Sequence, residues 1–331
     1  MSKTLGTIKK FFILLYHFLL IFTQSKSFID NKVIGSPTLN MLGLHVFRIL
    51  ITHCVARLKW ILLKNLITRE RRDSFHKNGF LVIENIFPTD IFNEVCLKAK
   101  QIQDDDYSYS ENNESTFTKQ MLLSQSNCEK FFGIDLYSFL KNNPSLNNSL
   151  KYVAANKTPP FIHFLNIIHG ENNEGDPQKH FHSDAFFPSM KAWIFLKEVT
   201  PEEGPFVYIP ESNRLTLARL RLEYQKSIQC AKREETIYQA LRGSFRYSES
   251  DIQSLNLPEP KSFCVKGNTL VIANMFGIHK RGNSTNKVSR TSLWFYSRLT
   301  PFLPFTGINS TIYDKIQNRM AEKRTYKKLT Q

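Results

Sequence analysis

Short apolar runs separated by turn-forming residues fill the second half of the chain. Each run is bounded by Gly, Pro, Asn or Asp, which is typical of short antiparallel strands. Because many short strands of this kind can close around a small central site, the pattern favours a mainly β, α+β fold built on a double-sheet jelly roll. The predicted strands are Phe161–Ile168, Lys191–Lys197, Pro205–Ile209, Ser262–Val265, Thr269–Ala273 and Arg290–Arg298.

Other patterns predict elements around these strands. The long charged stretch Arg214–Leu241 predicts a helical insertion between them. Earlier in the chain, Phe80–Ile83 is a short β-like run, and a helix is predicted from about Pro88 to about Lys100. Residues 103–120 are polar and include three adjacent aspartates. We interpret this stretch as a solvated loop, with cation binding by the aspartates as the alternative.

The N-terminal pattern is different. The apolar run Phe11–Phe22 follows Lys9 and Lys10 and is interrupted only by Tyr16 and His17. A spanning helix needs about 20 apolar residues, so the run is short for that role. The basic start resembles a signal peptide, but no pair of small residues follows that would mark a cleavage site. Three interpretations stay open: a membrane-associating or re-entrant helix, a signal or signal anchor, and a helix packed on the body.

A second helix is predicted at residues 39–66. Its apolar positions recur at helical spacing, and its polar side is basic. Such a helix can lie in a membrane interface or dock on the globular body, and the pattern does not decide between the two. Asn31–Pro37, between the two helices, contains Gly35 and is expected to be a linker.

Composition narrows the class of protein. The 331 residues are 41% hydrophobic and 22% charged, so most of the chain can bury a core. The 5 cysteines are far apart and never form a C-x-x-C pair. This spacing argues against a disulfide scaffold, a structural zinc module and a cysteine-ligated iron–sulfur cluster, and it suits a reducing compartment. The cysteines are Cys54, Cys96, Cys128, Cys230 and Cys264.

The net charge of +15 lies at the ends of the chain. Residues 1–72 hold 12 Lys/Arg and 2 Asp/Glu, whereas residues 73–313 hold 26 and 25. Nucleic-acid-binding folds carry their charge on the domain that reads the nucleic acid, so we expect no nucleic-acid partner. Basic segments flanking apolar ones favour an anionic membrane surface on the cytoplasmic side. The expected organisation is a basic helical segment (1–72), a jelly-roll domain (73–305) and a basic tail (306–331).

The sharpest chemical pattern is His182–Ser183–Asp184 together with His279. On a strand, residues two apart point to the same face, so His182 and Asp184 could coordinate one metal ion. His279 could provide the third ligand. Two histidines and one carboxylate are the ligands of non-haem Fe(II) oxygenases, and a zinc site would use the same three. His180 is a competitor on the same face, and we prefer His182 because it stands two residues from Asp184.

A cationic residue, Arg290, follows the histidine motif in the chain and could bind a co-substrate. Arg290 stands eleven residues after His279 and opens a predicted strand. Its planar guanidinium suits a carboxylate, as a dicarboxylate co-substrate would require. Ser292 lies on the same strand face and could add a hydroxyl donor. For the competing cations, Lys280, Arg281 and Arg298, we expect surface roles.

Together these motifs resemble the phytanoyl-CoA dioxygenase family of Fe(II)/2-oxoglutarate oxygenases. The resemblance covers about two-thirds of the chain, and residues 1–72 and the insertion near 214–241 fall outside it. It is carried by Asp73–Glu84, His182–Asp184, Ala192–Leu196, Gly204–Pro210, Gly267–Ile272, and His279 with Arg290.

The resemblance implies a double-stranded β-helix that holds iron through His182, Asp184 and His279. Arg290 would pair with the far carboxylate of 2-oxoglutarate, and Trp193 matches a position that contacts this co-substrate, with a buried strand aromatic as the alternative. Arg281 departs from the family pattern, because some members carry a small hydroxyl residue there.

The implied reaction consumes O₂ and releases succinate and CO₂. A carboxylate ligand favours hydroxylation of a C–H bond over halogenation, since related halogenases lack it. The basic, apolar N-terminus makes a lipid-like substrate attractive beside other small molecules. A non-catalytic jelly-roll module at a membrane is the alternative function, and a metal enzyme of different chemistry is a further one.

Overall fold

The computed structural model describes residues 2–107, 109–113, 116–169, 176–284, 289–297 and 301–307. Within them, the strands agree well with the runs predicted in the second half of the chain. The strands are β1 (Phe80–Ile83), β2 (Tyr109–Asn113), β3 (Thr116–Leu122), β4 (Phe161–His169), β5 (Met190–Phe195), β6 (Phe206–Tyr208), β7 (Lys261–Ser262), β8 (Thr269–Asn274), β9 (His279–Arg281) and β10 (Ser289–Ser297).

The strands form two antiparallel sheets. A seven-stranded sheet has the order β1-β8-β5-β10-β4-β3-β2, and a three-stranded sheet has the order β7-β6-β9. Side chains of both sheets share one apolar cluster, in which Trp193 of β5 packs on Phe206 of β6 with ring centroids 4.7 Å apart. The predicted α+β jelly roll, a double-stranded β-helix with added helices, is therefore the observed fold.

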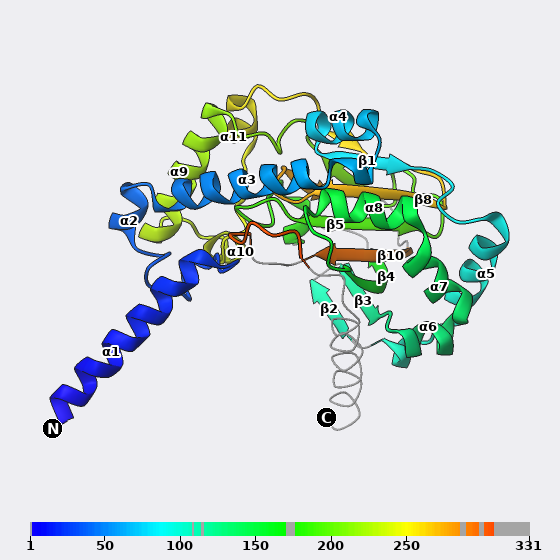
Figure 1. Cartoon of the computed structure of the whole chain (residues 1–331), viewed down its shortest axis with the longest axis horizontal. Helices are drawn as coiled ribbons and strands as arrows, with labels where there is room; N and C mark the ends of the chain where they lie inside the picture. The colour runs from blue at the N-terminus through cyan, green and yellow to red at the C-terminus, as the bar shows by residue number, and fades with distance from the viewer. Residues whose placement is uncertain are drawn as a thin grey trace.

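Helices surround the sheets, as Figure 1 shows. They are α1 (Ser2–Leu19), α2 (Pro37–Met41), α3 (Leu44–Leu62), α4 (Arg69–Asn78), α5 (Thr89–Ala99), α6 (Gln125–Phe131), α7 (Ile134–Asn142), α8 (Pro144–Val153), α9 (Leu217–Lys232), α10 (Tyr238–Leu241) and α11 (Glu249–Ser254). Four short 3₁₀ helices are η1 (Leu20–Phe22), η2 (Lys64–Leu66), η3 (Asp104–Asp106) and η4 (Pro177–Lys179).

The two faces of the large sheet have different partners. Because side chains alternate along a strand, Leu293 and Phe295 of β10 point to one face and Arg290 and Trp294 to the other. The first face packs against helices α3 to α8 in the largest apolar cluster. The second face carries residues that line a cavity. The helices thus support the sheet from outside, while its inner face stays available for polar side chains.

Residues 103–120 are not the solvated loop that their polarity suggested. They form η3, β2 and β3, and the two strands extend the large sheet at its edge. Thr118 and Gln120 of β3 line the cavity on the inner face. Lys119 pairs with Asp104, so at least one of the aspartates has a protein partner. The polar residues Thr118 and Gln120 were misread because they face an internal cavity instead of solvent.

The N-terminal region also differs from prediction in one respect. The expected linker Asn31–Pro37 is a packed turn in which Asn31 is buried and its side-chain oxygen accepts from the backbone N–H groups of Val33 and Ile34. A Cβ at Gly35 would lie 2.0 Å from the Phe28 carbonyl oxygen, so only glycine permits this close approach. The predicted second helix is split into α2, α3 and η2.

Helix α1 extends away from the rest of the molecule in Figure 1, whereas α3 packs against α9. The side chains of Phe11 and Phe12 are 63% and 61% exposed. Among the described residues, no helix is both long enough and apolar enough to cross a bilayer. Most residues of the basic C-terminal tail, 308–331, and Arg298 lie outside the described residues.

Candidate active site

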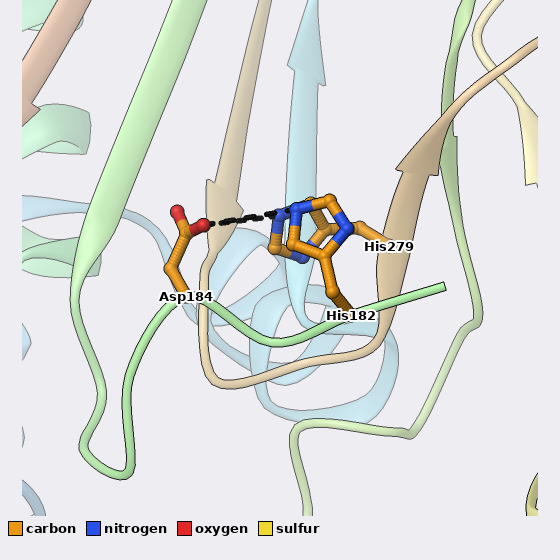
Figure 2. A group of neighbouring side chains, drawn as sticks. All are labelled: His182, Asp184 and His279. Atoms are coloured by element: carbon orange, nitrogen blue, oxygen red, sulfur yellow. Dashed lines mark ion pairs between the residues drawn. The ribbon is translucent and has the colours of Figure 1, made fainter. Parts of the chain in front are cut away.

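His182, Asp184 and His279 come together in the structure, as Figure 2 shows. The Asp184 Oδ1 atom is 3.8 Å from the Nε2 atom of each histidine. In the part of the chain that the structure describes, these are the side chains close enough to hold a metal ion together, with their ligand atoms within 4.8 Å of one another. The arrangement offers two nitrogens and a carboxylate, which is the ligand set expected from the sequence.

The backbone brings the three residues together in a way that the sequence did not suggest. His182 and His279 exchange two backbone hydrogen bonds of 2.9 Å in an isolated bridge, and Asp184 lies at a bend. The prediction that His182 and Asp184 share a strand face was therefore wrong, although their side chains do converge. Before His279, a Cβ at Gly277 would lie 1.8 Å from the Tyr208 hydroxyl oxygen, so this turn requires glycine.

Both histidine rings are held in the tautomer that a metal needs. The Nδ1 atom of His182 is 2.7 Å from the His180 carbonyl oxygen, and that of His279 is 2.9 Å from the Gly277 carbonyl oxygen. A carbonyl only accepts, so each Nδ1 carries the proton and each Nε2 presents a lone pair. Burial lowers the pKa of both rings and favours this neutral form. His180 itself is exposed and contributes its carbonyl, not its ring.

Asp184 is held as an anion beside these rings. Burial raises the pKa of its carboxyl, but its neighbours, with the Lys191 ammonium first among them, outweigh burial and keep that pKa well below its usual range. Its Oδ2 atom is 2.6 Å from the Lys191 ammonium, and its backbone oxygen accepts a hydrogen bond from Lys26. An ionised carboxylate beside two neutral imidazoles fits a divalent cation.

A cavity of about 240 Å³ adjoins the histidines. Its described lining contains four cationic side chains and no acidic one. Such a lining favours a small anion that carries more than one negative charge. The lining residues are Thr118, Gln120, Leu165, Ile167, Gln178, His182, Lys191, Trp193, Phe195, Phe206, His279, Lys280, Arg281, Arg290 and Trp294.

Arg290 is the buried cation of this cavity. It is 6% exposed, and one of its terminal nitrogens donates to the Gly204 carbonyl. Burial, followed by the neighbouring charge of Arg281, lowers its pKa to about 9, so it stays charged at neutral pH. A guanidinium in a desolvated setting binds a carboxylate more strongly than an exposed one does.

The other predicted residues have mixed placements. Trp193 lines the cavity, while Ser292 is buried on the same β10 face as Arg290 and Trp294 but is not among the lining residues. Arg281 was expected at the surface, but it lines the cavity and pairs with the buried Asp176 at 2.6 Å.

Lys280 also lines the cavity, with its ammonium 4.4 Å from the Phe181 ring centroid. The expectation of a surface role was therefore wrong for Lys280 as well as for its neighbour Arg281.

Sequence reasoning missed Lys191 and Lys26. Lys191 could have been found, because it stands two residues before Trp193 on a predicted strand and so shares its face. Lys26 carried no such signal, since it lies 158 residues before Asp184 in the chain.

A buried polar network supports the metal-binding loop from behind. The Tyr247 hydroxyl is 2.9 Å from the Ser183 hydroxyl, lies 2.8 Å from a Glu223 carboxylate oxygen, and accepts from Arg219 at 2.9 Å. The other Glu223 oxygen is 3.0 Å from His45 Nε2. Burial raises the Glu223 pKa, but Arg219 and then His45 outweigh burial and lower it to about 2. This network connects α3 and α9 to the residue between His182 and Asp184.

Comparison with known proteins identifies the family of the chain. A family model described as "Phytanoyl-CoA dioxygenase (PhyH)" matches residues 75–240, about half of the chain. The matched segment contains His182 and Asp184, whereas His279 and Arg290 lie beyond it. A search of curated protein sequences gives no significant match.

Several solved structures are similar to the chain. The epimerase SnoN, in complex with Fe³⁺, α-ketoglutarate and nogalamycin RO, is 16% identical over 69% of this chain and 81% of its own, with a TM-score of 0.45. HygX from Streptomyces hygroscopicus, with nickel and 2-oxoglutarate, is 16% identical over 74% and 92%, with a TM-score of 0.43. EctD from S. alaskensis, with bound Fe, is 12% identical over 75% and 83%, with a TM-score of 0.44.

Proposed function

Because this chain belongs to the phytanoyl-CoA dioxygenase (PhyH) family, we propose that it is an Fe(II)- and 2-oxoglutarate-dependent dioxygenase. It would hydroxylate an unactivated C–H bond of a small-molecule or lipid-like substrate and release succinate and CO₂. One observation carries this proposal: two neutral histidine nitrogens and an ionised carboxylate converge beside a cavity that contains the buried Arg290.

The three converging residues fit Fe(II). His182 and His279 present Nε2 lone pairs, and Asp184 supplies the negative charge that a divalent ion requires. When bound, the iron would supply the oxidative chemistry with O₂ and 2-oxoglutarate. The protein supplies ligand orientation through the carbonyls of His180 and Gly277, which fix the two rings. Because Asp184 is present as a ligand, we propose hydroxylation and not halogenation.

The cationic cavity fits 2-oxoglutarate. One end of this dicarboxylate would bind the metal, and Arg290 would hold the far carboxylate. Trp193 forms part of the cavity wall and would restrict the co-substrate to one orientation. Ser292 is buried on the same face of β10 as Arg290. Its hydroxyl would donate a hydrogen bond to the co-substrate only if the co-substrate reaches beyond the residues that line the cavity.

We further propose that the N-terminal region attaches the protein to an anionic membrane on its cytoplasmic side. Phe11, Phe12 and Leu14 are 63%, 61% and 54% exposed on α1, which extends away from the body in Figure 1. Apolar side chains that the body leaves uncovered favour burial in lipid. Residues 1–72 hold 12 Lys/Arg and 2 Asp/Glu. Each Lys or Arg near an anionic surface contributes about 1 kcal/mol to the free energy of membrane binding.

A product search tests the proposed reaction. The purified protein is incubated with Fe(II), 2-oxoglutarate, O₂ and a cell extract, and mass spectrometry looks for extract compounds heavier by one oxygen atom. We expect such a product with the wild-type protein and none with Asp184→Ala. A non-catalytic module would give neither product nor succinate, and a metal enzyme of other chemistry would not require 2-oxoglutarate.

A further inference from the structure

A second cavity, of about 180 Å³, lies on the other side of Asp184. Asp184 borders this cavity, the two histidines border the first one, and Lys191 lines both. The three metal-binding candidates therefore lie between two cavities. The second cavity is lined by Gln24, Lys26, Asp184, Ala185, Phe187, Ser189, Met190, Lys191, Met275, Tyr296 and Ser297.

The lining of the second cavity has a net positive charge. Lys26 and Lys191 contribute two ammonium groups, and Asp184 is the only acidic residue among the described lining. A metal ion bound to Asp184 would further reduce the negative charge available to the lysines. Hydroxyl and amide groups add hydrogen-bonding capacity at the same wall, as expected for a site that recognises a charged oxygen group.

The two lysines reach this cavity from unrelated parts of the chain. Lys191 belongs to β5 of the large sheet, and its ammonium lies 2.6 Å from Asp184 Oδ2. Lys26 belongs to the N-terminal region outside the family match, and it donates to the Asp184 backbone oxygen. An ammonium has three donors, so Lys191 can contact a further acceptor while it holds Asp184.

Part of the lining is apolar. Phe187, Met190 and Met275 are buried side chains that form part of the wall. Methionine and phenylalanine together accept an aliphatic chain without a demanding shape. A cavity lined by ammonium groups together with thioether and phenyl groups suits a molecule with an anionic head and an apolar body.

We propose that this second cavity recognises the substrate and that the substrate is an amphiphilic acid, whose carboxylate or phosphate is bound by Lys26 and Lys191. This assignment rests on the proposed function, because it takes Asp184 as a metal ligand. It places the anionic group of the substrate beside the metal centre and on the opposite side from Arg290. The competing explanation is that both lysines only neutralise Asp184.

Binding of matched probes to the full-length protein tests the proposal without turnover. Isothermal titration calorimetry compares decanoate and decyl phosphate with the uncharged decanamide and decanol. We expect both acids to bind at least about tenfold more tightly than their uncharged counterparts, as the strength of charge-assisted hydrogen bonds implies. The two acids also separate carboxylate from phosphate recognition.

Variants of Lys26 decide between recognition and neutralisation. Lys26→Met should remove most of the preference for the acids, whereas Lys26→Arg should retain it. Lys32→Met is the matched control, because Lys32 is exposed in the same N-terminal region and should leave binding unchanged. If Lys26→Met keeps the full preference for the acids, or if Arg290→Leu abolishes it, the proposal is overturned.

The failure of this proposal can be told from a failure of the proposed function. Probe binding is measured without Fe(II), while the proposed function is measured by 2-oxoglutarate-dependent formation of succinate. A protein that forms succinate but shows no preference for the acids contradicts only the substrate class. A protein that prefers the acids but forms no succinate with any of the four probes or the extract contradicts the proposed function.

Discussion

The loop His182–Asp184, which carries two of the candidate metal ligands, has two sides that are built differently. We call the residues around the 240 Å³ cavity the cavity side, and His45, Arg219, Glu223 and Tyr247 the buried side. The lining of the cavity side holds four cations and no acidic residue. Lys191 and Arg281 pair with Asp184 and Asp176 outside that lining, whereas Arg290 has no carboxylate partner among the described residues. Every ionisable group of the buried side has a partner. We expect an anionic ligand to bind where Arg290 lacks a carboxylate partner, and we expect the fully paired buried side to support the loop.

The comparison has an energetic reason. Burying a charge is costly unless the charge is paired and hydrogen-bonded. The residues of the buried side therefore stabilise the fold only when all of them are present. Glu223 meets this requirement through Arg219, His45 and Tyr247. On the cavity side, an anionic ligand would provide the carboxylate partner that Arg290 lacks. The cavity side should therefore respond to ligands, and the buried side should respond to substitutions of its own members.

The largest effect should come from the metal-binding residues of the loop. Alanine at His182, Asp184 or His279 should weaken Co(II) binding by at least about a hundredfold, since losing even a hydrogen-bond partner of a metal ligand costs about ten- to a hundredfold. His180→Ala is the matched control and should bind Co(II) normally, because its carbonyl remains. The measurement is an anaerobic absorbance titration. Loss of binding in His180→Ala together with retention in His182→Ala would show that the ligand assignment is wrong.

A substitution on the buried side should reduce stability instead. Arg219→Met removes the main charge partner of Glu223 and should lower the free energy of unfolding by roughly 3–5 kcal/mol. Arg221→Met is the control, because Arg221 is exposed on the same helix and should change stability little. Urea unfolding followed by circular dichroism measures both variants. Equal stability of the two variants would mean that the network contributes nothing to the fold.

The buried side also predicts a pH dependence. The Glu223 pKa of about 2 lies below its ordinary value of 4.5, so its stabilising contribution is present above pH 4.5 and is lost as the pH falls toward 2. The difference corresponds to roughly 3 kcal/mol. Glu223→Gln should therefore lose less stability than the wild type between these pH values. If the free energy of unfolding falls by the same amount in both proteins across this pH range, the prediction is contradicted.

The smallest expected effect concerns α1, which extends away from the body in Figure 1. Phe12→Ser should weaken binding to anionic vesicles by about thirtyfold, because burying a phenyl ring is worth roughly 2 kcal/mol. Leu97→Ser is the control, since Leu97 is 61% exposed on α5. Vesicle co-sedimentation measures both. Substitution is preferable to deleting residues 1–30, because Lys26 contacts Asp184 and Phe28 is buried. If Phe12→Ser binds the anionic vesicles as tightly as the wild type, α1 does not contribute to membrane binding.

The sequence predicted the cavity side better than the buried side. The strands follow from local periodicity, because periodicity reports which residues share a strand. The triad and Arg290 were expected from the motif and the family resemblance, although the shared-face argument for His182 and Asp184 was wrong. The partners His45 and Glu223 lie 178 residues apart, and no local pattern connects them. Polar residues of β3 were assigned to a loop for a related reason: polarity does not tell an internal cavity from solvent.

The central claim is that the triad and Arg290 bind Fe(II) and 2-oxoglutarate together. Anaerobic addition of both to the full-length protein should produce the charge-transfer absorption that appears when 2-oxoglutarate chelates Fe(II). His279→Ala should abolish this absorption, and Arg290→Leu should raise the required 2-oxoglutarate concentration by about thirtyfold or more, for the loss of roughly 2–5 kcal/mol. A wild-type protein that binds Fe(II) without this absorption, or an Arg290→Leu variant with unchanged 2-oxoglutarate affinity, would contradict the account.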